Sequence, residues 1–178
     1  MKKVLVLSAS PRKGGNSDTL CDEFIKGAIE AGHAVEKIFL RSQKIGYCMG
    51  CGACAKTGVC VLKDDMADIL QKMIDADVIV MATPVYFYTM NAQLKTLIDR
   101  TVARYEEIKN KEFYYIISAA DTSIENMQKT IESLRGFTTD CLDGTVEKGI
   151  IYGVGAWQIG DIKKLPVCRQ AYETGKAV

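Results

Sequence analysis

The thiol-bearing residues between positions 48 and 60 have the spacing of ligands to a metal centre. Cysteine stands at Cys48, Cys51, Cys54 and Cys60, in the pattern C-x2-C-x2-C-x5-C. Three thiols within one turn can surround a single centre, and the fourth can complete it. Tetrathiolate zinc usually takes two separated C-x2-C pairs, so this compact series favours a 4Fe-4S cluster. Free thiols or a redox disulfide, and a zinc site, are the alternatives.

A second group of polar residues follows the first predicted strand. Residues 4–7 (VLVL) form an apolar run typical of a buried parallel strand, and the polar loop 8–16 leads into a helix beginning near Ser17. Serine hydroxyls, loop N–H groups and a helix N-terminus, with Arg12 and Lys13 nearby, suit a phosphate monoester. An ordinary turn is the alternative. The loop has neither the triphosphatase nor the dinucleotide glycine pattern, so a mononucleotide is favoured.

Composition places the chain among soluble globular proteins. It has 178 residues, 48% of them hydrophobic and 25% charged, which suits one domain spanning 1–178. The net charge of +1 offers no general attraction to nucleic acid or to a membrane surface. No apolar run approaches the roughly 20 residues of a membrane span, so we expect a cytoplasmic protein. In that reducing compartment the seven cysteines serve as ligands, redox groups or buried apolar residues rather than disulfides.

Strands and helices alternate along the chain. The predicted strands cover residues 4–7, 34–40, 78–82, 113–119 and 148–153. Helices are predicted from near 17 to a cap at Gly32, from 64 to about 74, from 91 to 105, after Asp121, and from 161 to 175 with an interruption near Pro166. Residues 42–63, with four cysteines and four glycines, form a long functional loop. This alternation indicates one parallel sheet with helices on both faces.

Three loops of such a sheet are expected to meet. Ligands bind outside the carboxyl ends of parallel strands, where loops 8–17, 83–91 and 118–123 converge. Tyr86, Phe87 and Tyr88 put three aromatic rings in the second loop, and backbone amides near Pro84 and Val85 can face the edge of a flat aromatic cofactor. The alternative is that these rings only pack on the loop.

The remaining thiols and the one histidine are not assigned to chemistry. Cys21, Cys141 and Cys168 are isolated, and we expect them to pack in the core. His33 follows the first helix and is expected at the surface.

In this order, the motifs SASPRKGGNS, the cysteine loop followed by KDDM, and TPVYFYTMNAQLKTLIDR resemble the flavodoxin-like NADPH-dependent FMN reductases, and within them the iron-sulfur flavoproteins. The resemblance is strong over about residues 1–120 and looser in the tail. It implies a three-layer α/β sandwich with five parallel strands in the order 2-1-3-4-5. It also implies a homodimer or homotetramer with the flavin near a subunit interface, and a cysteine loop close to a neighbouring subunit's flavin.

The resemblance carries the family's site residues to this chain. Non-covalent FMN would be held at its phosphate by Ser8, Ser10, Arg12, Asn16 and Ser17, with Thr19 as a further candidate. Its isoalloxazine ring would lie against Pro84, Val85, Tyr86 and Phe87, with Ala119, Ala120 and Asp121 from the third loop. The ligands of a 4Fe-4S cluster would be Cys48, Cys51, Cys54 and Cys60.

The implied function is that of an FMN-dependent oxidoreductase. NAD(P)H or a ferredoxin-like protein would supply electrons, a small molecule would accept them, and the flavin would exchange electrons with the cluster. Because the reactive centre belongs to the cofactor, no catalytic acid or base is assigned. One alternative is an electron carrier between protein partners. Another is a plain FMN reductase whose cysteines bind zinc or act as redox thiols.

Overall fold

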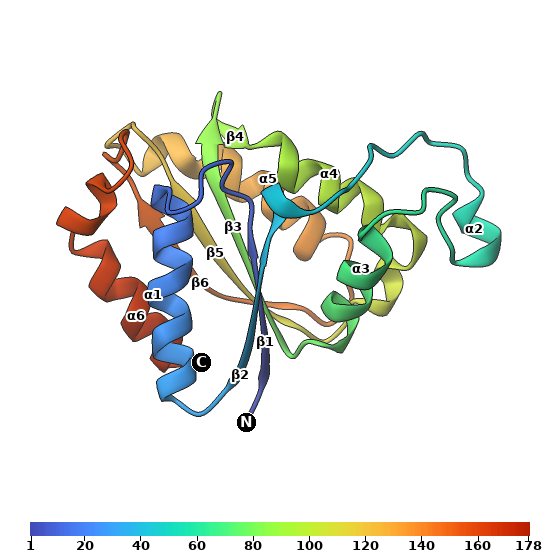
Figure 1. The fold of residues 1–178 in the computed structure, drawn as a ribbon, viewed down its shortest axis with the longest axis horizontal. Helices are drawn as coiled ribbons and strands as arrows, with labels where there is room; N and C mark the ends of the chain where they lie inside the picture. The colour runs from blue at the N-terminus through green and yellow to red at the C-terminus, as the bar shows by residue number, and fades with distance from the viewer.

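A twisted sheet of parallel strands runs through the middle of the molecule (Figure 1). The computed structural model describes residues 1–178. Its parallel strands, in the order β2-β1-β3-β5-β6, are β1 (Lys3–Ser8), β2 (Ala34–Phe39), β3 (Val78–Tyr86), β5 (Glu112–Ser118) and β6 (Val146–Gly153). These five strands lie in the predicted order. The sheet differs from the prediction by a sixth, short strand, β4 (Thr89–Met90), which pairs with β3.

Helices cover both faces of the sheet, as predicted (Figure 1). One face packs against α1 (Asn16–Glu30) and α6 (Val167–Lys176), and the other against α3 (Met66–Asp75), α4 (Ala92–Arg100) and α5 (Gln128–Thr138). Successive side chains of a strand point to opposite faces, so Val4 and Val6 lie in one core and Leu5 and Leu7 in the other. The apolar runs therefore indicate buried parallel strands correctly.

Glycine brings α1 and α6 into backbone contact. A Cβ atom on Gly27 would lie 2.0 Å from the carbonyl oxygen of Tyr172, and one on Gly175 would lie 2.0 Å from that of Phe24. No other residue allows two helix backbones to approach this closely. The interrupted final helix is confirmed, with a 3-10 turn before Pro166 and α6 after it.

Short helical segments complete the chain. The first helix is followed by Gly32 at φ 84°, and His33 N donates to the carbonyl of Ala28 at 3.0 Å, which confirms the predicted cap.

One short helix, α2 (Cys54–Thr57), lies within the cysteine loop. The 3-10 turns are Leu40–Ser42, Thr101–Ala103, Tyr105–Glu107, Glu125–Met127 and Asp161–Lys164.

The second predicted site loop is instead a β-hairpin. The strand predicted to end at Ala82 continues to Tyr86, and Val85 pairs with Met90 of β4. Phe87 and Tyr88 form the two-residue turn, with φ of 50° and 64°. Such turns normally contain Asn or Gly, so an aromatic pair does not indicate one.

Two predicted helices are shorter in the structure. The α-helix expected over 91–105 ends at Arg100 and continues in 3-10 turns, so Val102 is exposed rather than inward. The helix expected directly after Asp121 begins at Gln128, and Ile124 is exposed. The carboxylate of Asp121 instead accepts from Ser123 N at 2.8 Å, which supports a turn before α5.

The isolated cysteines and the histidine differ in their surroundings. Cys21 is fully buried, as predicted, and burial raises the pKa of its thiol to about 12. The prediction is wrong for Cys141, which is exposed because it lies in the turn after α5. Cys168 is half-buried and packs against the same core as Cys21, in line with the prediction. His33 is half-buried and accepts from Lys2 N through Nδ1. No helix is both long and apolar enough to span a membrane.

Candidate functional site

The loops that follow β1, β3 and β5 meet at the carboxyl edge of the sheet. Asn91 Nδ2, at the base of the hairpin, donates to the carbonyl of Ala9 at 2.5 Å. Ala156 N donates to the carbonyl of Ala119 at 2.9 Å, and Asn16 Nδ2 donates to the carbonyl of Ala156 at 3.1 Å. These bonds connect the first loop directly with the second, and with the third through Ala156 in the segment after β6, so the three loops meet as the topology predicts.

The first loop folds tightly against the N-terminus of α1. Ser10 Oγ and the backbone of Arg12 exchange hydrogen bonds, and Gly15 N donates to the carbonyl of Arg12 at 2.9 Å. Gly15 is the N-cap of α1 and provides no side-chain acceptor for the first-turn N–H groups. A Cβ atom there would lie 2.6 Å from Ser10 Oγ, so the close fold requires glycine. An uncapped helix N-terminus under a tight loop fits an anionic group.

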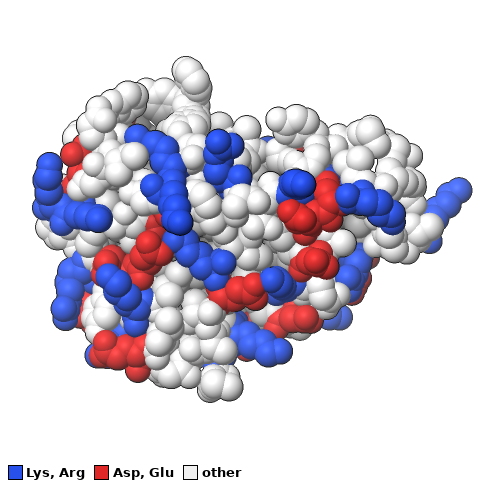
Figure 2. Space-filling view, viewed as in Figure 1, with Lys and Arg blue, Asp and Glu red and all other residues white.

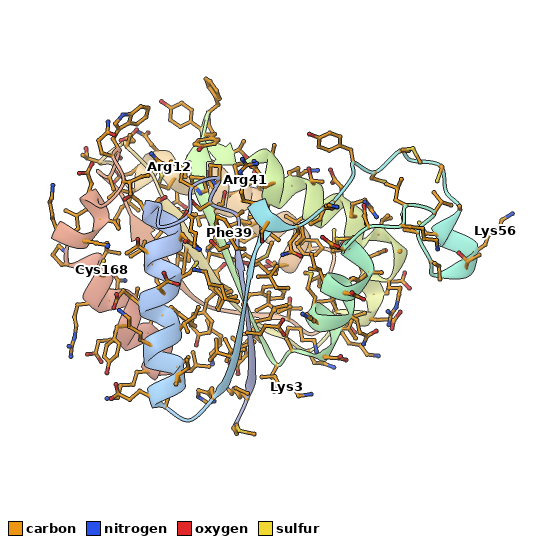
Figure 3. The ribbon with its side chains drawn as sticks, viewed as in Figure 1. Lys3, Arg12, Phe39, Arg41, Lys56 and Cys168 are labelled. Carbon is orange, nitrogen blue, oxygen red and sulfur yellow. The ribbon has the colours of Figure 1, made fainter.

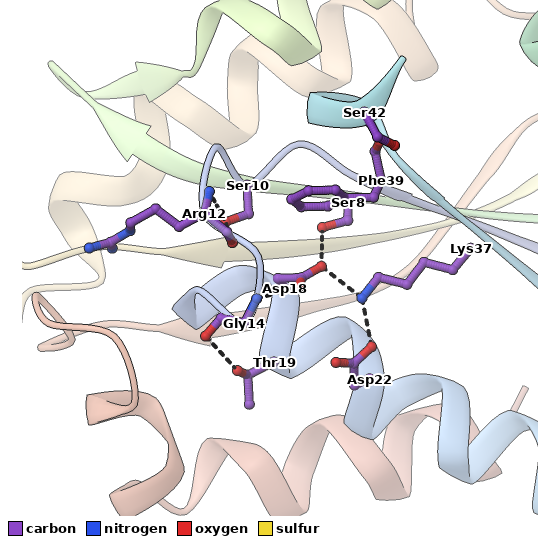
Figure 4. A network of polar contacts seen from close by, with 10 residues as sticks. All are labelled: Ser8, Ser10, Arg12, Gly14, Asp18, Thr19, Asp22, Lys37, Phe39 and Ser42. Atoms are coloured by element: carbon purple, nitrogen blue, oxygen red, sulfur yellow. Dashed lines mark hydrogen bonds and ion pairs between the residues drawn. The ribbon is translucent and has the colours of Figure 1, made fainter.

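A buried ionic network lies beneath this loop (Figure 4). Asp18 accepts from Ser8 Oγ at 2.7 Å and from Gly14 N at 2.9 Å. Lys37 Nζ of β2 lies 2.7 Å from Asp18 Oδ1 and 2.6 Å from Asp22 Oδ1. Burial alone would raise the pKa of Asp18, but the hydrogen bonds from Lys37 and Ser8 hold it below its usual value. The ionised carboxylate therefore anchors the loop to the helix and to the edge of the sheet.

The predicted phosphate residues divide into buried and accessible groups. The Ser8 hydroxyl is used by Asp18, and the Asn16 amide by Ala156 and by Ile162 N at 3.4 Å. Arg12 is exposed at the mouth of the loop, where one guanidinium nitrogen donates to the carbonyl of Trp157 at 3.3 Å. Ser10, Ser17 and Thr19 are buried along the loop and the first turn of α1.

The residues predicted to bind the flavin ring lie at the same carboxyl edge of the sheet, on the second and third loops. Pro84 is buried, Val85 is half-buried, and the Tyr86 and Phe87 side chains are 46% and 99% exposed. From the third loop, Ala119 is buried, Ala120 is exposed and Asp121 is half-buried. In Figure 2 charges of both signs mix over the lower part of this face, while the upper edge near the hairpin is largely uncharged. An apolar, accessible edge beside an anion-binding loop suits a flat ring that carries a phosphate.

Three residues that position this edge were missed from sequence. Asn91 caps α4 by accepting from Leu94 N at 3.2 Å, and its amide also holds Thr83 and the first loop. An Asn directly before an apolar helical period is the signal that could have found it. Asp18 and Lys37 have only a weak signal, namely one acid in a first helical turn and one lysine within a strand.

The four candidate metal ligands gather around one cavity. Cys48, Cys51, Cys54 and Cys60 line about 240 Å³ in the loop that extends from the body between β2 and α3 (Figure 1). Gly50, Gly52 and Gly58 have φ of 63°, 70° and 67°, conformations that allow the chain to turn tightly around it. The side chains are not drawn together as in a formed ligand group. Four thiols around one mainly apolar cavity are a donor set that fits iron-sulfur or zinc chemistry.

The base of the cysteine loop is closed by an ion pair. The guanidinium of Arg100 makes two hydrogen bonds to Asp64, at 2.7 and 2.9 Å, and donates to the carbonyl of Gly46 at 2.6 Å. Gly46 N in turn donates to Asp64 Oδ2 at 2.8 Å. The hydrogen bonds from Arg100 hold the pKa of Asp64 below its usual value. We call this group, Gly46, Asp64 and Arg100, the neck of the loop.

Comparison with known proteins identifies the family of this chain. The family model described as NADPH-dependent FMN reductase matches residues 2–157. An iron-sulfur flavoprotein of Methanosarcina thermophila is 36% identical over 135 residues, which are 74% of this chain and 70% of that protein. Iron-sulfur flavoproteins of Archaeoglobus fulgidus and Methanocaldococcus jannaschii are 43% and 41% identical over 56% of this chain. The match covers 45% and 51% of those two proteins, about half of their length.

Solved structures share the architecture along nearly the whole chain. An NAD(P)H:quinone oxidoreductase from Methanothermobacter marburgensis has a TM-score of 0.75 at 20% identity, covering 98% of this chain and 94% of that one. An FMN-dependent NADH-azoreductase from Bacillus anthracis, solved in complex with FMN, also has a TM-score of 0.75, at 16% identity and with 99% of each chain covered. At these identities the likeness establishes the fold, and the predicted flavodoxin-like architecture is confirmed.

Proposed function

This chain is a member of the NADPH-dependent FMN reductase family, and on that premise we propose that it is an FMN-dependent oxidoreductase. It takes electrons from NAD(P)H or from a ferredoxin-like protein and passes them to a small-molecule acceptor. The observation that carries the proposal is the meeting of an uncapped helix N-terminus with an apolar hairpin at the carboxyl edge of the sheet. Bound FMN supplies the redox chemistry by accepting a hydride or single electrons.

The residues of this chain bind and orient the flavin. The N-terminus of α1, the Ser10 loop and the exposed guanidinium of Arg12 hold the phosphate. Backbone groups around Val85 and the ring of Tyr86 lie where they can contact the flavin ring. Ser8 and Asn16 act indirectly in this proposal, because their polar groups hold the loop itself.

The cysteine loop is proposed to bind a 4Fe-4S cluster through Cys48, Cys51, Cys54 and Cys60. The support is the common cavity of the four thiols, the tight glycine turns between them, and the similarity to proteins named iron-sulfur flavoproteins. A cluster exchanges one electron at a time, so beside FMN it would convert two-electron chemistry into one-electron chemistry.

We also propose a homodimer or homotetramer. The exposed aromatic side chains at the flavin edge, Phe87 at 99% and Trp157 at 70% exposure, are the kind of surface that association covers. Sedimentation of the FMN-loaded protein over a tenfold concentration range measures the state of assembly. A monomer throughout would refute this part of the proposal.

The first experiment is the content of FMN, iron, acid-labile sulfide and zinc in protein purified without oxygen. One FMN with about four irons and four sulfides per chain is expected. FMN without iron would refute the cluster, zinc in its place would identify a structural metal site, and the absence of FMN would refute the flavin site. Cys54→Ser should remove iron and keep FMN, whereas the matched control Cys141→Ser, outside the loop, should change neither.

A second measurement separates an enzyme from an electron carrier. NADPH and NADH are mixed with the FMN-loaded protein under anaerobic conditions, and flavin bleaching is followed in a stopped-flow instrument. Bleaching within seconds, followed by turnover with a quinone or azo dye, supports the reductase. Bleaching only by a reduced ferredoxin, with no turnover of a small-molecule acceptor, would refute it in favour of a carrier.

A further inference from the structure

Arg100 is buried to an unusual degree for an arginine. It is the bulkiest of the fully buried side chains, with 1% of its side chain exposed. It lies at the end of α4, while its partners lie 54 residues away at Gly46, in the cysteine loop, and 36 residues away at Asp64, directly after it. A buried arginine requires a reason, because removing a guanidinium from water is unfavourable.

Stability alone does not supply that reason. The attraction within a buried ion pair roughly offsets its desolvation, and apolar residues of similar volume often stabilise a fold as well. Asp64 also has partners other than Arg100. Its carboxylate accepts hydrogen bonds from Gly46 N at 2.8 Å and from Met66 N, at the start of α3, at 3.2 Å. What Arg100 adds is the attachment of both ends of the loop to α4 and a positive charge at the base of the loop.

The guanidinium also faces sulfur. One terminal nitrogen of Arg100 lies 3.5 Å from Cys60 Sγ, within the range of an N–H···S hydrogen bond. Its Nε is buried and has no hydrogen-bond partner. Arg100 lines both the cavity of the four cysteines and a neighbouring cavity of about 630 Å³ that also reaches Cys60. An unpaired buried donor is rare and destabilising, so an acceptor is expected near it.

We propose that Arg100 is a positioning residue for the cysteine centre: paired with Asp64, it closes the neck of the loop, and it directs donors and positive charge toward the sulfur atoms at Cys60. The part that concerns the 4Fe-4S cluster rests on the proposed function. One-electron reduction adds negative charge to a cluster, and a nearby cation with N–H···S bonds favours the reduced state. Arg100 therefore raises the reduction potential of the centre and holds the loop in a shape that can form it.

The neck is tested first in the protein without metal. Lys56 projects from α2 on the far side of the loop (Figure 3) and is exposed, so trypsin reports how often the loop opens. In Arg100→Gln we expect cleavage after Lys56, followed by mass spectrometry, to be about tenfold faster than in the wild type. Arg100→Lys keeps the charge but loses the two-fold contact with Asp64, and should be intermediate.

The matched control is Arg135→Gln. Arg135 also makes a two-fold contact, with Glu147 at 2.8 Å, but it joins α5 to β6, away from the cysteine loop. Cleavage after Lys56 should be unchanged in this variant. Equal rates of cleavage after Lys56 in wild type and Arg100→Gln would refute the proposal that Arg100 closes the neck. Should Arg100→Gln fail to fold by circular dichroism, Arg100→Lys decides, and a rate equal to wild type there would overturn the neck as well.

The effect on the centre is tested in reconstituted protein by redox titration followed by electron paramagnetic resonance. The equilibrium constant for one-electron reduction of the cluster should fall about tenfold in Arg100→Gln, which corresponds to about 59 mV. An unchanged potential with a full cluster would overturn this part of the inference. A wild-type protein that takes up no iron and sulfide would instead refute the proposed cluster, while the trypsin test would still decide the neck.

Discussion

Asp18 Oδ1 and Lys37 Nζ lie 2.7 Å apart, directly under the loop that follows β1 (Figure 4). Asp18 belongs to the first turn of α1 and Lys37 to the edge strand β2, so the pair fixes the helix to the sheet at the candidate phosphate site. The side chain of Asp18 is 5% exposed and that of Lys37 is 23% exposed. A shielded pair of this kind makes stability depend on pH.

We expect the free energy of unfolding to fall as the pH drops below about 4. Burial opposes ionisation of Asp18, but the hydrogen bonds from Lys37 and Ser8 leave its folded-state pKa lowered. The stabilisation is therefore present above the unfolded-state pKa of about 3.9 and is lost as the pH falls through the lower, folded-state value. Urea unfolding between pH 2 and 7 measures it.

Asp18→Asn should remove part of this acid dependence and cost about 2 kcal/mol at pH 7. The matched control is Asp22→Asn, because Asp22 contacts the same ammonium but is 52% exposed. It should cost less than about 1 kcal/mol. The same acid slope in Asp18→Asn and wild type would contradict the role given to this carboxylate.

Gly27→Ala should destabilise the protein by about 2 kcal/mol or more. The added Cβ atom would lie 2.0 Å from the carbonyl oxygen of Tyr172, so α1 and α6 would have to move apart. Gly136 is the matched control, since it is also inside a helix but a Cβ atom added there would have no neighbour within 4 Å. Gly136→Ala should be neutral or stabilise by up to about 1 kcal/mol. Urea unfolding of both variants checks this, and equal effects would show that α1 and α6 are not held by close contact.

The two aromatic residues at the hairpin tip should lower the stability of the protein and strengthen its binding of FMN. Phe87 and Tyr88 have φ of 50° and 64°, so replacing them together by Asn-Gly should raise the free energy of unfolding by about 1–2 kcal/mol. The same variant should bind FMN more weakly because it lacks the rings. Replacing both by Ala is the control, since it removes the rings and keeps the strain. FMN affinity equal to wild type in both variants would exclude the rings from the site.

Arg12→Ala should weaken FMN affinity about tenfold and leave thermal stability unchanged, because an exposed charge–phosphate contact is lost without any change in packing. Asn16→Ala should lower both, since its buried amide holds Ala156 and Ile162. Titration with quenching of FMN fluorescence measures affinity. Lys13→Ala, a neighbouring exposed cation, is the control and should have a smaller effect. Unchanged affinity in Arg12→Ala would overturn the assignment of this guanidinium.

Much of the fold could be predicted because its signals are local. The runs at 4–7 and 78–82 are apolar at every position, as expected for strands that are buried on both faces. These strands determine where the sheet lies and which of its edges can bind a ligand. The cysteine spacing is local too, and in the structure the four thiols line one cavity without forming a ligand group. The hairpin at Phe87 and Tyr88 escaped prediction because the pairing of β3 with β4 on either side requires a two-residue turn there, against the local preference of aromatic residues for negative φ.

The neck could not be predicted, because its signal is not local. Arg100 stands in the last turn of α4, where a basic residue normally faces solvent and interacts with the helix dipole. Only the folded chain brings it to Asp64 and Gly46 and buries it. The Asp18–Lys37 pair is similar, since nothing in either segment indicates the other.

Because its two ends are held together at the base, the cysteine loop forms a separate unit beside the sheet. Lys44 N donates to Asp65 Oδ2 at 2.6 Å and Asp65 N to the carbonyl of Lys44 at 3.0 Å, so the segment that follows β2 and the segment that leads into α3 lie side by side. Everything between can be lengthened, shortened or exchanged without moving β2 or α3. We therefore expect that replacing the segment between Gly46 and Asp64 by a loop without cysteines leaves the α/β fold intact, because the hydrogen bonds between Lys44 and Asp65 lie outside the exchanged segment.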